Sequence, residues 1–90
     1  MTTIIMTDCT AWNGVKYISF YVKGGRMVGE IDHIDGKHKV FYGEGVRAQV
    51  IGVRSDKDSA IRQLQNAIRA GIQGDVKFNW SVTAERYSLA

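Results

Sequence analysis

The sequence contains no proline and only one cysteine, Cys9, and these shortages exclude several classes of protein. A single cysteine cannot form a disulfide within the chain, and the paired spacing of zinc-binding cysteines is missing. No apolar run approaches the roughly 18 residues that a membrane-spanning helix needs, and residues 1–14 lack the basic and apolar segments of a signal peptide. We therefore expect a protein of a reducing cytoplasm, which is the host cytoplasm if a phage encodes it.

The composition also has no feature of a specialised class. Ninety residues with 44% hydrophobic and 10% aromatic side chains indicate a single globular domain, 1–90. The formal net charge of +3 permits a nucleic-acid partner without favouring one, because such proteins usually cluster a larger positive charge. The glycines at 24–29 and 43–45 lack the lysine and hydroxyl residues of a phosphate-binding loop. We expect no cofactor, no enzymatic activity and no small-molecule substrate.

Short glycine-containing turn sequences divide the first part of the chain into segments with a high propensity for β-structure. The turn sequences are "NG" at 13–14, "GG" at 24–25, "DG" at 35–36 and "GEG" at 43–45. Asn-Gly and Asp-Gly are typical of two-residue hairpin turns, whose central residues need positive φ. The pattern predicts an antiparallel meander of about five strands at 3–12, 15–23, 26–34, 37–42 and 46–54.

The lengths of these turns predict which residues face one another. Two-residue turns at the first three positions place Cys9 opposite Ile18 and Ile31 opposite Val40. A three-residue loop at the fourth turn places Ala48 opposite the same valine. All five residues then share one apolar face of the sheet.

The pattern changes after the fifth predicted strand. Apolar residues at helical spacing predict a helix over 56–70, with Ser55 as its N-cap and Asp58 as the capping-box partner. Alternation from Val76 to Val82 predicts a last strand, beside either the first or the fifth strand. The fold class is therefore α+β: an antiparallel meander, one helix on one face and a C-terminal strand.

The stretch "DHIDGKH" at 32–38 contains both histidines of the chain. With Asp35-Gly36 as the turn, His33 and His38 form a cross-strand pair on one face. Asp32 points to the other face, so only two candidate ligands converge. A protein zinc site needs three or four ligands, and we favour a simple histidine pair over a metal site.

One helix cannot cover both faces of the predicted sheet, and the second face mixes aromatic side chains with charged ones. An exposed patch of this kind is typical of a contact surface. The alternative is a sheet that curls into a half-barrel and buries part of the face. The residues that we expect to contact a protein partner are Met6, Trp12, Tyr17, Tyr21 and Phe41.

Two kinds of partner fit this face. Carboxylates at Asp8, Glu30 and Asp32 would repel phosphates, so we favour protein contact, including a homodimer, over nucleic-acid binding. Small accessory proteins of phages and mobile elements often act in this way, by occupying a partner. The alternative nucleic-acid surface comprises Lys37, Lys39, Arg47, Arg62 and Arg69, of which the last two also fit a solvated helix face.

Overall fold

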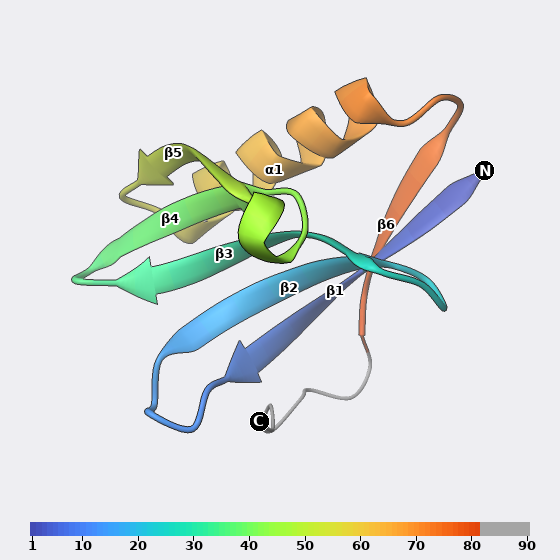
Figure 1. Cartoon of the computed structure of the whole chain (residues 1–90). Coiled ribbons are helices and arrows are strands. Elements are labelled where there is room, and N and C mark those ends of the chain that lie inside the picture. Colours follow the sequence, from blue (N-terminus) through green and yellow to red (C-terminus); the bar gives the residue numbers. More distant parts are fainter. Residues whose placement is uncertain (82–90) are drawn as a thin grey trace.

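The computed structural model describes residues 1–81 as one six-stranded sheet with a single α-helix across one of its faces (Figure 1). This confirms the predicted α+β class, and the last strand is part of the same sheet. Val82, which was predicted for the last strand, lies outside the described residues. The elements are β1 (Thr2–Thr10), β2 (Lys16–Val22), β3 (Met27–Ile34), β4 (Lys37–Tyr42), the 3₁₀ turn η1 (Gly45–Arg47), β5 (Gln49–Arg54), α1 (Lys57–Gly71) and β6 (Val76–Trp80).

The strands follow the order β5-β4-β3-β2-β1-β6 across the sheet. β6 pairs with β1 in parallel, and the other neighbouring strands are antiparallel. The last strand therefore lies beside the first, which was one of the two positions left open by the sequence. Phe78 of β6 packs edge-on against Phe20 of β2, with 6.4 Å between the ring centroids.

The β3–β4 hairpin has the predicted register. Ile31 pairs with Val40 and His33 pairs with His38. The two turn residues Asp35 and Gly36 have φ angles of 52° and 75°. Both are positive, as a two-residue turn of this type requires.

The predicted register of β1 against β2 is wrong by one residue. Ala11 N donates to Val15 O, so the loop contains three residues and only its last residue, Gly14, has positive φ. Cys9 pairs with Tyr17 and not with Ile18. Because side chains alternate along a strand, this slip exchanges the two faces of β1.

The turn between β2 and β3 is also one residue longer than predicted. A bulge in the strands compensates for the extra residue, so the predicted register returns further along the hairpin. Val22 N donates to Arg26 O, which leaves three residues in the loop. A bulge between Phe20 and Tyr21 shifts the register again, and Ile18 still pairs with Ile31 as predicted.

The predicted pairing of Ala48 with Val40 is wrong. Val40 pairs with Gly52, and the register shifts between Val40 and Phe41. The residues that were assigned to the start of a strand form η1 instead, so β5 begins only at Gln49.

The core lies between α1 and the covered face of the sheet. α1 contacts β3, β4 and β5 and buries Ala60, Leu64 and Ile68, which are spaced at one turn each. The residues that form this core are Ile4, Met6, Ile18, Phe20, Ile31, Val40, Ala60, Leu64 and Ile68. None of the helices in residues 1–81 has the length and apolar character that crossing a membrane requires.

The helix begins one residue later than predicted and has a different cap. Asp56 is the N-cap, and its Oδ2 accepts a hydrogen bond from Ser59 N at 2.8 Å. Ser55, which was predicted for this role, precedes the cap. An aspartate here satisfies a free N–H of the first turn and places negative charge at the positive end of the helix dipole.

Candidate functional site

The face of the sheet that α1 does not cover is the first candidate site, and we call it the open face. Tyr17 and Tyr21 lie on it because they alternate along β2 with the buried residues Ile18 and Phe20. In residues 1–81 no second α-helix lies on this side. The open face comprises Tyr17, Ser19, Tyr21, Glu30, Asp32, Lys39, Phe41, Val50 and Val53.

Three of the five residues predicted for protein contact lie on the open face: Tyr17, Tyr21 and Phe41. Met6 does not lie there, because the one-residue shift in the register of β1 places its side chain in the core. Met6 is 3% exposed, and its Sδ lies 3.6 Å from the amide nitrogen of Gln65. Trp12 lies in the β1–β2 loop and is 88% exposed.

β1 contributes a different set of side chains to this side of the sheet. Thr7 and Cys9 point away from α1 and are both buried, and the Thr7 hydroxyl donates to the Tyr21 hydroxyl at 3.2 Å. Val50 and Val53, on β5 at the far edge, are 48% and 54% exposed. The accessible apolar area of the open face therefore lies toward β4 and β5.

A pair of carboxyl groups occupies the middle of the open face. Glu30 and Asp32 are two residues apart on β3 and therefore point to the same side. Burial raises the pKa of Glu30 from its ordinary value of 4.5 to about 8, and the hydrogen bond to Asp32 and the charge of Asp32 act in the same direction. At neutral pH the Glu30 carboxyl keeps its proton, which reduces the negative charge at this point of the sheet.

Both carboxyl groups lie on the face that their positions in the sequence predict. The structure shows a hollow of about 320 Å³ beside the pair, with η1 at its border. Among residues 1–81, Asp32 Oδ1 is buried and has no hydrogen-bond partner. The hollow is lined by Met27, Glu30, Asp32, Phe41, Gly43, Gly45 and Ala48.

The basic residues predicted for nucleic-acid contact do not form one surface. Lys39 lies on the open face, with its Nζ 5.6 Å from the centroid of the Phe41 ring. Arg69 lies on α1, on the other side of the sheet, with its guanidinium 4.9 Å from the Phe78 ring. The remaining three residues are also divided between the sheet side and the helix. Lys37 lies on β4 and Arg47 in η1, whereas Arg62 lies on α1.

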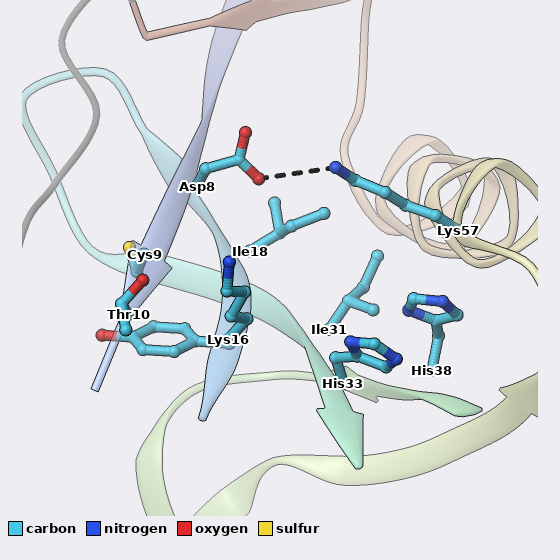
Figure 2. A pocket seen from close by; sticks show the side chains of 10 residues that line it. Asp8, Cys9, Thr10, Lys16, Ile18, Ile31, His33, His38 and Lys57 are labelled. Atoms are coloured by element: carbon cyan, nitrogen blue, oxygen red, sulfur yellow. Dashed lines mark ion pairs between the residues drawn. The ribbon is translucent and has the colours of Figure 1, made fainter. Parts of the chain in front are cut away.

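A groove on the covered side of the sheet is the second candidate site (Figure 2). It lies beside the first turn of α1 and has a volume of about 560 Å³. Sequence reasoning missed this groove because the slip in β1 had placed Asp8 on the open face. Its lining residues are Asp8, Cys9, Thr10, Lys16, Tyr17, Ile18, Ile31, His33, His38 and Lys57.

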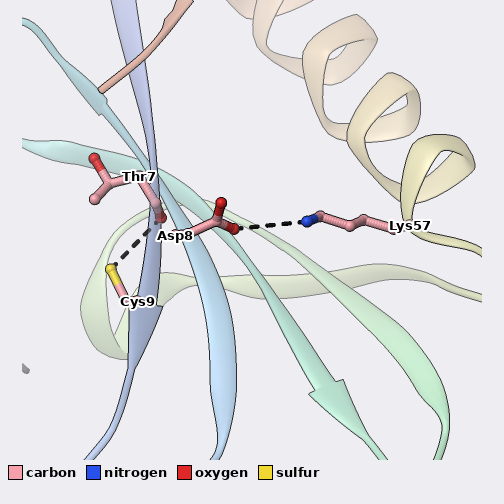
Figure 3. Close-up of polar contacts among 4 residues, drawn as sticks. All are labelled: Thr7, Asp8, Cys9 and Lys57. Carbon is pink, nitrogen blue, oxygen red and sulfur yellow. Dashed lines mark hydrogen bonds and ion pairs between the residues drawn. The ribbon is translucent and has the colours of Figure 1, made fainter. Parts of the chain in front are cut away.

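An ion pair closes one side of this groove. Asp8 Oδ1 lies 3.7 Å from Lys57 Nζ and so connects β1 to the start of α1 (Figure 3). Lys57 Nζ also lies 5.9 Å from the centroid of the Trp80 ring. Cys9 follows Asp8 but points to the other face, where its thiol donates to Thr7 O at 3.5 Å.

The histidine pair lies on the opposite side of the groove. The rings of His33 and His38 stack with their centroids 4.6 Å apart and their planes 12° apart. Burial lowers the pKa of His38, and the nearby charges of His33 and Lys57 lower it further. Within residues 1–81, no cluster of three or more histidine, cysteine, aspartate or glutamate side chains is placed to hold a metal ion.

The sequence and the fold were compared with known proteins. No protein family matches the chain, and neither a curated protein nor a solved structure matches it.

Proposed function

We propose that this protein is a non-enzymatic binding protein that contacts another protein, or a second copy of itself, through the open face. The observation that carries the proposal is that Tyr17 and Tyr21 of β2 and Phe41 of β4 share one face of the sheet with the exposed Val50 and Val53 of β5. Aromatic side chains bury a large area at little entropic cost and are enriched at protein interfaces.

The charge of the open face supports a protein partner over a nucleic acid. A protonated Glu30 reduces the negative charge at the centre of the face, and the positively charged Lys39 lies opposite Asp32 in the register of β4 and β3. The centre is then close to neutral, which lowers the cost of removing it from water. The arginines of α1 lie on the other side of the sheet, so one nucleic-acid strand on the open face would not reach them.

Charge-introducing substitutions at the edge of the open face test the proposal. We expect Val50→Lys with Val53→Lys to weaken self-association, measured by sedimentation, or capture of a partner from a lysate, because two ammonium groups would be desolvated in the contact. Both valines are exposed, so the double variant should keep its fold. Ala70→Lys on α1 is the control: it adds one positive charge on the other side of the sheet, where the double variant adds two on the open face.

Three results would contradict the proposal. The first is equal association or capture by the double variant and the parent. The second is an equal loss with Ala70→Lys, which would indicate a general effect of charge. The third is capture that disappears after nuclease treatment and falls steeply with salt, which is the behaviour of a nucleic-acid binder.

We place this activity in the cytoplasm as part of the same proposal. Cys9 is a buried thiol, and a thiol of this kind persists where disulfide formation is suppressed. Fractionation of cells that express the tagged protein tests the location, and recovery in a secreted fraction would contradict it.

A further inference from the structure

The groove beside the first turn of α1 has the size and shape of a small-molecule site. Its volume of about 560 Å³ falls within the roughly 300–1,000 Å³ that is typical of such sites. Ile18 and Ile31 form its floor, and polar side chains surround them (Figure 2). An inorganic ion would leave most of this space unfilled, whereas an organic molecule would fill it above the floor, where Ile18 and Ile31 are themselves 5% and 1% exposed.

The polar side chains around the floor are mainly nitrogen donors. Lys16 lines the groove from β2, and His33 and His38 line it from β3 and β4. Within residues 1–81 these three side chains make no hydrogen bond or ion pair, so their nitrogens remain available to a ligand. Among the lining residues within 1–81, Asp8 is the one acid, and Lys57 already pairs with its carboxylate.

We propose that this groove binds a small organic anion, with its body above the floor of the groove and its phosphate or carboxylate group between Lys16 and the stacked histidines. The ammonium group and the imidazole N–H groups donate to the anion, and charge-assisted hydrogen bonds of this kind are stronger than neutral ones. The groove lies on the covered side of the sheet, with Tyr17 at the border of both sites, and this inference does not depend on the proposed protein contact.

Naphthyl phosphate is a suitable probe because it combines an anionic group with a planar apolar body. Titration followed by NMR should move the ring resonances of His33 and His38. Inorganic phosphate and naphthol, which each supply one half of the probe, should bind more weakly than naphthyl phosphate. Naphthoic acid tests the carboxylate in the same way. No binding of naphthyl phosphate or naphthoic acid up to the solubility limit would overturn the proposal.

Matched variants locate the site. Lys16→Gln should weaken naphthyl phosphate binding by about three- to tenfold, because it removes one charged donor and keeps the side-chain stem. Lys37→Gln removes the same charge from β4 on the open-face side and should leave binding unchanged. Equal effects of the two variants, or shifts that spare both histidines, would overturn the proposal. Lys16 lies on the covered side, and Lys16→Gln should not change self-association or partner capture, so failure here is distinguishable from failure of the protein contact.

Discussion

Leu64 of α1 fills the space directly above Gly29 of β3. A Cβ atom at position 29 would lie 2.8 Å from Leu64 Cδ1 and 3.0 Å from the backbone oxygen of Phe41. Phe20 and Tyr42 pair with Gly29 from the two neighbouring strands. The glycine therefore lets the helix approach the sheet at a point where large side chains stand on both sides.

Substitution of this glycine should destabilise the fold. We expect Gly29→Ala to reduce the free energy of unfolding by about 1–3 kcal/mol, because the added methyl group overpacks the core beneath α1. Urea denaturation measures the effect. Gly25→Ala is the control, since its Cβ would meet Val22 at an ordinary 3.5 Å and its φ is not positive. A loss no larger than in this control would contradict the close approach of α1.

The N-cap of α1 can be identified by comparing two neighbouring positions. Asp56→Ala should cost about 1 kcal/mol of stability, because Ser59 N loses its acceptor and the helix loses a favourable charge. Ser55→Ala should change stability by less than about 0.5 kcal/mol. Thermal or urea unfolding of the two variants tests this order, and a larger loss at position 55 would restore the cap predicted from the sequence.

The raised pKa of Glu30 makes stability depend on pH. The folded state keeps the Glu30 proton up to about pH 8, whereas the unfolded state loses it near the ordinary value of 4.5. The folded state therefore binds more protons between these limits, and its stability falls as pH rises through this window. Relative to the parent, Glu30→Gln should become more stable with rising pH across the same window.

Urea denaturation at several pH values between these limits measures this difference. Glu44→Gln removes an exposed carboxylate that lies 3.8 Å from Arg26 and provides the control. A constant stability difference between Glu30→Gln and the parent at every pH would show that Glu30 ionises normally in the folded protein.

The histidine pair offers a direct measurement of a pKa. We expect His38 to titrate below 6.5 in the parent, and its pKa to rise in His33→Ala because a neighbouring positive charge is removed. Asp56→Asn should lower the pKa of His38 further, since the Asp56 carboxylate favours the charged imidazole. Ring proton shifts followed by NMR report both changes, and an unaltered pKa in His33→Ala would contradict the coupling.

The sequence was sufficient for the elements whose turns have a distinctive backbone. Asp35-Gly36 requires positive φ at two successive residues, and this fixed the β3–β4 register, including the pair of His33 with His38. The helix was predicted within one residue at each end because its apolar spacing is regular. Local conformational preferences decide both features.

The register of β1 depends on information that is not local. Either face of this strand offers apolar residues, with Ile4 and Met6 on one and Ile5 and Cys9 on the other, so hydrophobic alternation does not choose between them. Asn-Gly also fits a three-residue loop, in which the Asn13 side chain accepts a hydrogen bond from Val15 N. The core beneath α1, in which Met6 is buried, selects the face that contains Met6.

The register of β1 also decided which residues of the candidate sites were placed correctly from the sequence. Tyr17, Tyr21 and Phe41 lie on strands whose face was assigned correctly, whereas Met6 and Asp8 moved with β1. The elevated pKa of Glu30 depends on burial in the assembled sheet. Sequence spacing places the two carboxyl groups on one face, but it does not give their exposure to water.

The pairing of β6 with β1 has a consequence for how the molecule folds. The strands from β1 to β5 are joined by short hairpin connections, whereas β6 must find the strand most distant from it in sequence. Closing so long a loop costs entropy before any contact repays it, and such contacts slow folding. We expect the five-stranded meander to form first, and pulsed hydrogen exchange should show β6 amides gaining protection last. Until then the outer edge of β1 remains unpaired.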